Sequence, residues 1–521
     1  MKNKIGILVL TLILAFALAG CSSNEGTQTS GTKEYKDVLR VALEAQPTTL
    51  DPQMITGSPT KIVMRHVFET LVTLNSEFQP VPMLAESVDM SEDGRLYTFN
   101  LRKGVTFQNG KELKAEDVVA SMNRWIQLYD AARNVMGDNA IFKEVDEYTV
   151  ELVLEEPALG TLGVMATHKQ FPAIMPKEII DSAKPEGVTE FIGTGPFQYV
   201  EWKQDQYIHL KKYEDYKSVD TPADGLAGKK EALVDDLYFD IVTDPSTRLS
   251  GLQTGQYDVG LAMDTNNYEQ LKSSKNENVY VYPIGNTILA YNKKQGAFAD
   301  NKMRHAVNAA INAQEILEVA FGNEDLYKAN SGYMSESQPE WYSDAGKEMY
   351  NQANPEKAKE LLKEAGYNGE EIKFLTTRDD AYQYKGAVVI KEQLEKIGMN
   401  IKLQTVDWAS YSGLMKDPSN YDMVTFGITL VTSPSQLSTL GVDRPGYGAD
   451  PKISELLVKS ERATSQEEAK TYWDEAQRLA WEDYLPITQI GEFNHIAATT
   501  NKVDGFTVLN GAILWNTKVS K

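Results

Sequence analysis

Apolar and polar residues alternate along most of the chain in short stretches that predict strands and helices in turn. Val38–Leu43 is a predicted strand that runs into a turn at Glu44–Pro47. Tyr97–Arg102 alternates with a period of two, and the alternation resumes at Val105–Phe107 before the turn signal Asn109–Gly110, which predicts two strands of a half-exposed sheet. Strands that alternate with helices throughout favour an α/β fold.

Helix signals follow at several places. Lys114–Asp117 opens a predicted helix whose apolar stripe contains Val118, Met122 and Trp125. Another predicted helix starts at Asn354-Pro355 and ends at Gly366, ahead of a predicted strand at Ile372–Leu375. Two capping boxes predict further helix starts, Asn312-x-x-Glu315 and Ser465-x-x-Glu468.

The N-terminus has the pattern of a secretory signal. Lys2 and Lys4 precede an apolar run from Ile5 to Leu18, which is too short to span a bilayer, and small residues then lead to Cys21. This pattern predicts a signal peptide over residues 1–20 and a lipid on Cys21, the only cysteine of the chain. Residues 21–36 are polar and predict a flexible tether, so we expect a protein that is anchored to the membrane without crossing it.

Net charge and chain length limit the partners and the number of lobes that we expect. The formal net charge is −22, which makes nucleic acid an improbable partner because phosphate binding requires clustered Lys and Arg. About 500 mature residues exceed one ordinary hydrophobic core, so we expect two or three lobes.

Several longer motifs are spread along the chain. They are Ala85-Glu86-Ser87, Asp93-Gly94, Tyr97-Thr98-Phe99-x-Leu101-Arg102-x-Gly104-Val105-x-Phe107-x-Asn109-Gly110, Ala115-Glu116-Asp117-Val118, Gly193-Thr194-Gly195-Pro196-Phe197 with Glu201-Trp202, Leu252-x-x-Gly255-x-Tyr257-Asp258, Met303-Arg304-His305-Ala306 with Ala310-Ile311-Asn312, and Asn354–Gly366. In these motifs the chain resembles the family 5 extracellular solute-binding proteins of ABC importers, the oligopeptide-, dipeptide- and nickel-binding type, in its lipoprotein form. The resemblance covers nearly all of the mature chain.

The resemblance implies a two-lobed periplasmic-binding-protein-like clamp of type II, cluster C, with an extra subdomain. Lobe I is expected from 37–62, 189–282 and 494–521, the extra subdomain from 63–188 and lobe II from 283–493. Two strands are expected to cross between the lobes near Val279–Gly285 and Gln489–Phe493. Closure about these hinges would bury a small ligand, and we expect a monomer that hands it to permease subunits and their ATPases, at the extracellular face of the membrane or in the periplasm.

The resemblance also implies ligand-facing segments. They are Glu44–Pro47 with Glu44 and Gln46, the pair Asp407-Trp408, and the segment Met423–Ser435 with Phe426, Gly427, Ile428 and Thr429. Peptide-binding relatives usually carry an aspartate near Phe426–Pro434 for the α-ammonium of the ligand, and this chain has no acidic residue there. Either another carboxylate replaces it, with Glu44 and Glu492 as candidates, or the ligand has no free amine.

Other functions have weaker support in the sequence. Ser58-x-x-Lys61 has the spacing of penicillin-interacting serine enzymes, but the companion motifs Ser-Asp-Asn and Lys-Thr-Gly are absent, so we expect no enzyme. The five histidines are scattered without ligand spacing, and we expect neither a metal nor another cofactor. An oligosaccharide remains an alternative ligand, and an adhesive lipoprotein remains an alternative class that would lack a deep cavity between lobes.

Overall fold

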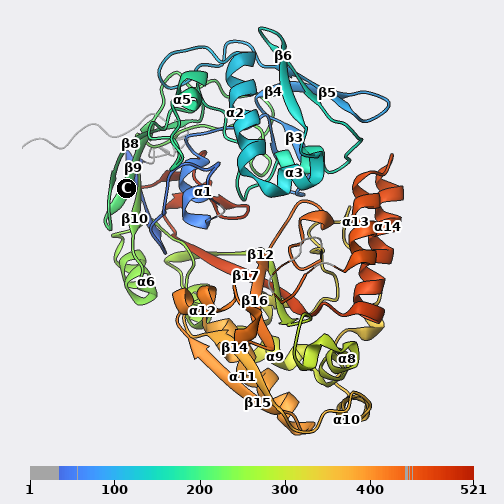
Figure 1. Cartoon of the computed structure of the whole chain (residues 1–521). Coiled ribbons are helices and arrows are strands. Elements are labelled where there is room, and N and C mark those ends of the chain that lie inside the picture. The colour runs from blue at the N-terminus through green and yellow to red at the C-terminus, as the bar shows by residue number, and fades with distance from the viewer. Residues whose placement is uncertain (1–33, 56, 441–443, 445, 449) are drawn as a thin grey trace, which may run out of the picture. The chain divides into compact units, whose positions relative to one another are not determined.

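The computed structural model describes residues 34–55, 57–440, 444, 446–448 and 450–521, and Tyr35–Lys521 forms one compact unit (Figure 1). The predicted signal peptide, Cys21 and most of the predicted tether lie outside the described residues. Among the helices described, none has the length and apolar character needed to cross a bilayer.

A mixed sheet of eleven strands forms the framework, in the order β15-β14-β16-β12-β17-β11-β1-β10-β9-β8, with β13 added beside β17. Strand β1 runs parallel to β10 and β11, and β14 runs parallel to β15 and β16, as in α/β folds. The bounds are β1 Val38–Leu43, β8 Phe197–Lys203, β9 Tyr207–Lys212, β10 Asp236–Ile241, β11 Val259–Gly260, β12 Glu277–Tyr291, β13 Tyr327–Lys328, β14 Glu371–Thr377, β15 Asn400–Val406, β16 Met423–Thr429 and β17 Ile487–Thr500.

Strands β12 and β17 are the long elements of this sheet, with 15 and 14 residues, and they pair with each other along most of their length. The second half of β12, from Gly285, also pairs with β16. The end of β17, at Ala498 and Thr499, pairs with β11 on the other side. Each long strand therefore runs from one part of the sheet into the other, and a register irregularity at Pro283–Gly285 marks the middle of β12.

A separate four-stranded antiparallel sheet, β4-β5-β7-β6, lies with α2 in the first half of the chain (Figure 1). Its strands are β4 Ala85–Met90, β5 Leu96–Leu101, β6 Ile141–Asp146 and β7 Thr149–Val153. Three two-stranded ribbons complete the strands, β2 Val72–Leu74 with β3 Pro80–Pro82, β18 Val503–Asp504 with β21 Lys518–Val519, and β19 Thr507–Val508 with β20 Ala512–Ile513.

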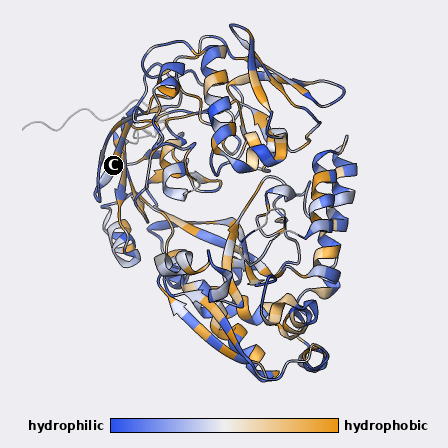
Figure 2. Cartoon of the chain, in the orientation of Figure 1, coloured by the Kyte–Doolittle hydropathy of each residue, from blue (hydrophilic) through white to orange (hydrophobic). Residues whose placement is uncertain are grey.

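The helices alternate with the strands along the chain. They are α1 Ser58–Met64, α2 Ala115–Leu128, α3 Asp130–Met136, α4 Thr161–Met165, α5 Lys177–Asp181, α6 Pro245–Thr254, α7 Tyr268–Ser273, α8 Asn301–Ala310, α9 Ala313–Phe321, α10 Pro355–Glu364, α11 Ala381–Lys396, α12 Trp408–Leu414, α13 Pro451–Glu461 and α14 Gln466–Leu479. Apolar and polar stretches alternate along them, as Figure 2 shows for α2 and for the α13–α14 pair.

Buried apolar side chains gather in separate cores. The first contains Val41 of β1, Phe239 of β10, Phe99 of β5 and Trp125 of α2, so the four-stranded sheet shares its core with the β1 end of the large sheet. A second core is built from α8, α9, α11 and β14, and a third from β16, α13 and α14. Two groups of elements thus have their own cores, and β12 and β17 join them.

Most predicted elements are confirmed. The helix starts at Asn312, Asn354 and Ser465 have the expected caps, since each side chain accepts a hydrogen bond from the backbone N–H three residues later. The strand predicted at Val105–Phe107 is wrong. Left-handed turns at Gly104 and Gly110 fold the chain back at once, and only the isolated bridge between Thr106 and Glu112 forms there.

The motif Gly193-Thr194-Gly195 has a packing reason. A Cβ at Gly195 would lie 2.5 Å from the carbonyl oxygen of His66, and one at Gly193 would also meet the backbone of Val67. The Gly195 N–H donates to Val67 O at 2.9 Å. Glycine lets the two backbones touch, which fixes the segment after α1 against the start of β8.

Candidate functional site

A pocket of about 530 Å³ lies between the two groups of elements that β12 and β17 join. One wall comes from α1, the α2–α3 junction and the loop at 169–170, and the other from the end of β16 and the loop after it. The first wall includes Ser58, Lys61, Tyr129, Asp130, Asn134, Lys169 and Gln170, and the second includes Thr429, Ser435, Gln436, Ser438 and Arg444. We call this space the interlobe pocket.

Lys61 is the buried charged residue of the first wall, with 4% of its surface exposed. Its side chain forms no ion pair or hydrogen bond with any residue that the structure describes. Burial lowers the pKa of Lys61 to about 7, and the positive charges of Arg65 and Lys169 lower it further in the same direction. The guanidinium of Arg65 is held by the carbonyl oxygens of Lys61, Leu509 and Asn510.

Lys169 stands beside Lys61 on the same wall. Burial lowers the pKa of Lys169 to about 8. The neighbouring His168 is buried and contacts the Asn510 side chain at 3.1 Å, and burial together with nearby lysines keeps its pKa well below 6.5. The positive charge on this wall therefore comes from lysine and not from histidine.

Strand β16 brings its end to the opposite wall. Thr429 pairs with Gly285 at the irregular middle of β12 and is the one of the eight predicted ligand residues that lines the interlobe pocket in the described chain. Phe426 packs on Tyr447 with ring centroids 5.4 Å apart, and Ile428 is buried in the third core. A Cβ at Gly427 would lie 2.7 Å from the Tyr382 hydroxyl and 3.2 Å from the Phe493 ring, so this glycine serves close packing.

Glu44 follows β1, at the carboxyl end of a parallel strand, where ligands bind in open α/β sheets. Its Oε2 atom is buried and has no hydrogen-bond partner among the described residues. Burial raises the pKa of Glu44, although the positive charge of Arg248 opposes this rise. Gln46 is occupied differently, because its side-chain oxygen accepts a hydrogen bond from Asp205 N at 2.5 Å.

The two remaining predicted residues have local roles. The Glu492 carboxylate accepts hydrogen bonds from the Asn330 side chain, from Ser335 Oγ at 2.7 Å and from Glu336 N at 3.1 Å. These internal donors leave Glu492 poorly suited to receive an ammonium, and Glu44 does not line the interlobe pocket. Trp408 begins α12, is 51% exposed and stacks on Tyr411.

A set of contacts joins residues 156–163 to the segment after β16 and to the end of α13. Glu461, at the end of α13, accepts a hydrogen bond from Gly160 N at 3.0 Å, and its own carbonyl oxygen accepts one from Leu159 N at 2.8 Å. Thr432 Oγ1 donates to Gly163 O at 2.8 Å, and Arg462 pairs with Glu156 at 3.1 Å. We call residues 156–163 with Thr432, Glu461 and Arg462 the clasp.

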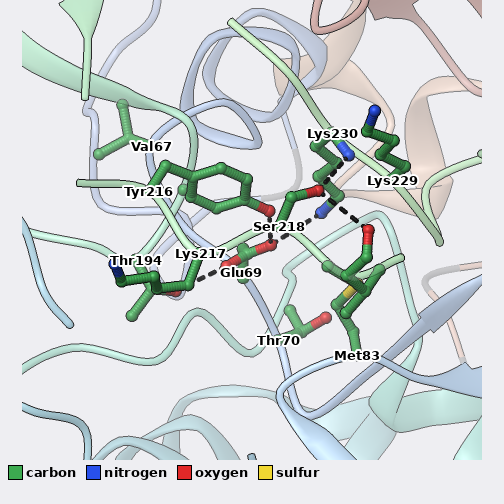
Figure 3. Close-up of polar contacts among 12 residues, drawn as sticks. Val67, Glu69, Thr70, Met83, Thr194, Tyr216, Lys217, Ser218, Lys229 and Lys230 are labelled. Carbon is green, nitrogen blue, oxygen red and sulfur yellow. Dashed lines mark hydrogen bonds and ion pairs between the residues drawn. The ribbon is translucent and has the colours of Figure 1, made fainter. Parts of the chain in front are cut away.

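A second buried charge cluster surrounds Glu69. Glu69 accepts hydrogen bonds from Thr194 Oγ1 at 3.0 Å and Tyr216 OH at 2.8 Å, and it forms an ion pair with Lys230 at 3.1 Å (Figure 3). Lys230 also lies 4.8 Å from the centroid of the Trp515 ring. All charges of this cluster are matched internally, which marks it as structural.

The enzyme-like spacing Ser58-x-x-Lys61 places both residues at the interlobe pocket. In the described structure, however, no hydrogen bond joins the Ser58 hydroxyl to the Lys61 ammonium, and a nucleophile needs such contact with its base. No group of three or more His, Cys, Asp or Glu side chains in the described ranges is arranged to hold a metal ion.

Sequence reasoning missed Lys169, Arg444 and the clasp, and it named Lys61 only within a catalytic motif. Loop lysines carry no periodic signal. Their burial depends on how the α2–α3 junction packs against the end of β16, and no single segment encodes that packing. Asp130 could have been noted at the α2–α3 junction, but it is paired with Arg133.

The family model of bacterial extracellular solute-binding proteins, family 5 Middle, matches residues 79–446. The chain is 28% identical over 506 residues to a probable peptide ABC transporter periplasmic-binding protein, y4tO, of Sinorhizobium fredii, covering 92% of each protein. It is 26% identical over 501 residues to the glutathione-binding protein GsiB of Salmonella choleraesuis, covering 91% of this chain and 92% of that one.

A solved structure shows the same two-lobed fold. The periplasmic binding protein AgaA of A. tumefaciens R10, in complex with agropinic acid, is 26% identical to this chain. The TM-score is 0.77, and the match covers 93% of this chain and 99% of AgaA.

Proposed function

Because the chain belongs to the bacterial extracellular solute-binding proteins of family 5, we propose that it is the substrate-binding component of an ABC importer and that it captures a peptide between its two lobes. The observation that carries this proposal is the interlobe pocket, whose walls come from both groups of elements that β12 and β17 join. An adhesive protein or a rigid scaffold has no need of such a space.

The arrangement supports a clamp mechanism. The long strands β12 and β17 join the two lobes, and the clasp adds a small number of hydrogen bonds between them. Breaking the clasp and bending β12 and β17 would open the pocket to solvent. A ligand that contacts both walls then shifts the equilibrium toward the closed form, which the importer can recognise.

We propose the lobe boundaries given above for lobe I, lobe II and the extra subdomain, with the hinges in the middle of β12 and β17. A lipid on Cys21 would hold the protein as a monomer at the extracellular face of the membrane, near its permease and ATPases. On this proposal the pocket binds its solute without chemical change.

A peptide is supported by the peptide-transport relative from Sinorhizobium fredii. A non-peptide solute is the second candidate, because AgaA was solved with agropinic acid. The absence of an acidic residue over Phe426–Pro434 is consistent with either ligand, and Glu44 stays a candidate for an ammonium because its buried Oε2 atom has no hydrogen-bond partner among the described residues.

Native mass spectrometry of the purified protein tests the proposal. We expect a bound solute that is released on unfolding and that fragments as a peptide. Small-angle scattering should show that the emptied protein expands and contracts again when the solute returns. A protein that carries no solute and keeps its dimensions with every peptide and sugar offered would contradict the proposed function.

A further inference from the structure

The charges that line the interlobe pocket have the opposite sign to the charge of the whole protein. The chain has a formal net charge of −22, yet the pocket is lined by Lys61, Lys169 and Arg444. Asp130 is the one acidic residue among the described lining residues, and its carboxylate is paired with Arg133. The pocket is thus a cationic site in an acidic protein.

A comparison of two buried lysines shows how unusual Lys61 is. Lys61 and Lys230 are each 4% exposed. Lys230 has the matching carboxylate of Glu69 at 3.1 Å. Lys61 has no matching carboxylate among the described residues, although a buried ammonium without a counter-charge destabilises a fold.

Neighbouring side chains add to the unmatched positive charge at Lys61. Arg65, one helical turn along α1, is held by carbonyl oxygens and brings a further positive charge without a carboxylate. Lys169 adds another, and both charges act on Lys61. Selection for stability alone would remove such a cluster, whereas a site that receives an anion requires it.

We propose that Lys61 and Lys169 form a carboxylate-binding subsite, so that the solute delivered by this protein is an acidic one. The proposal rests on the proposed solute-binding function and adds the chemical class of the ligand. On closure, the hydroxyl groups of Thr429 and Ser438 on the second wall can donate to the same oxyanion, whereas the Ser435 hydroxyl already donates to Glu461. Both lysines stand on lobe I, so the acidic group binds to the open protein first.

The stability of the ligand-free protein tests the first half of the proposal without any knowledge of the ligand. Lys61→Met keeps the shape of the side chain and removes the unmatched charge, so we expect the melting temperature to rise by about 2 °C. Lys230→Met is the matched control and should lower the melting temperature, because it leaves Glu69 buried and unpaired. A fall with Lys61→Met would show that Lys61 is structural and would overturn the proposal.

Ligand binding tests the second half. The probes are glutathione and its diethyl ester, and the tripeptides Ala-Glu-Ala and Ala-Gln-Ala with an amidated terminus, titrated by calorimetry at fixed ionic strength. We expect each acid to bind more tightly than its neutral partner, by about tenfold. We expect Lys61→Met and Lys169→Met to remove that preference, so that the ratio of the affinities for the acid and its neutral partner falls from about ten to about one.

The outcomes separate this inference from the proposed function. If solutes bind and compact the protein but the neutral partners bind equally well, the solute-binding function stands and the carboxylate subsite is overturned. Stabilisation by inorganic phosphate in place of the carboxylates would likewise overturn the carboxylate assignment. If no solute of any kind binds, the proposed function fails, and the inference that rests on it fails with it.

Discussion

Glu44 combines burial with a hydrogen-bond acceptor that has no partner among the described residues. Burial raises its pKa in the folded protein above the ordinary value of 4.5. The folded state therefore keeps this proton to a higher pH than the unfolded state does. Below pH 4.5 the Glu44 carboxyl is protonated in both the folded and the unfolded state and does not lower the free energy of unfolding. As pH rises through the raised pKa, the folded protein is progressively destabilised.

We therefore expect Glu44→Gln to make the ligand-free protein more stable at pH 8, by roughly 1 kcal/mol, and to have little effect at pH 4. Chemical denaturation at several pH values measures the difference. A variant that is less stable than the native protein at pH 8 would show that the Glu44 carboxylate has a stabilising partner in solution.

Lys61 gives a second dependence on pH. Its pKa is about 7 in the ligand-free protein, and a bound carboxylate would raise it. Affinity for an acidic solute should be highest below pH 7, where Lys61 is protonated with and without ligand. It should fall as pH rises from 7 toward the higher pKa of the complex, by up to about tenfold for each unit between the two values.

Calorimetric titration from pH 6 to pH 9 checks this prediction. The other charged groups around Lys61 are Arg65, Lys169 and Arg444, with Asp130 paired to Arg133. His168 stays neutral because its pKa is lowered well below 6.5. The dependence should disappear above pH 7 in Lys61→Met except for a smaller part from Lys169, whose pKa is about 8. An affinity of the native protein that does not change with pH would contradict this prediction.

The sequence could predict where a residue lies in its element when the local pattern is plain. Glu44 follows β1 as predicted and Thr429 ends β16 at the interlobe pocket, while their roles in ligand binding stay predictions. The hydrogen bonds of Glu492 could not be predicted, because its three donors come from residues 330–336, which no local pattern connects to β17.

At the scale of elements, the clasp joins the loop before α4 to the end of α13. Gly160 lies against the Glu461 carboxylate so closely that a Cβ there would overlap it. We expect Gly160→Ala to weaken closure and to lower the affinity for solute by roughly tenfold, since a hydrogen bond to a charged group contributes about 1.5–3 kcal/mol.

Titration of the same solute against both proteins measures this effect. Gly413→Ala in α12 is the matched control, because its Cβ would meet no atom within 4 Å. It should leave affinity unchanged and stabilise the helix slightly. If Gly160→Ala and Gly413→Ala bind the solute with equal affinity, the clasp does not contribute to lobe closure.

Helix starts could be predicted well because a capping side chain and its partner are three residues apart. The strand at Val105–Phe107 was mispredicted because its alternation was real but its length was limited by glycine turns on both sides. The partners of β5 are β4 and β7, which are distant in sequence, and alternation alone says nothing about partners.

At the scale of the whole molecule, lobe closure can be controlled by a disulfide. A Cβ at Gly163 would lie 3.7 Å from Thr432 Cβ, close to the spacing of about 3.8 Å found in disulfides. Cys21 is the only natural cysteine, so a Gly163→Cys/Thr432→Cys variant has one designed pair within residues 35–521.

We expect this pair to form and to hold the lobes closed. The oxidised, solute-free variant should take up solute at least tenfold more slowly than the native protein, and reduction should restore the rate. Stopped-flow fluorescence measures the rate, and each single cysteine variant serves as a control. Unchanged uptake by the oxidised variant would mean that solute enters without separation of these segments.

The two-lobed fold could be predicted from the family motifs, but the contacts between the lobes could not. The motifs lie mainly inside each lobe, at turns and helix starts, where they fix local geometry. Contacts such as that between Thr432 and Gly163 join residues 269 positions apart and depend on how far the lobes have closed.

The location of the two pocket lysines has a consequence for how such proteins diversify. Lys61 and Lys169 stand on lobe I, whereas the closing contacts are made by other residues. A change at these two positions would alter which nutrients are accepted and leave the moving parts intact. The solute specificity of an uptake system can then change through very few substitutions while the contacts that close the lobes stay the same.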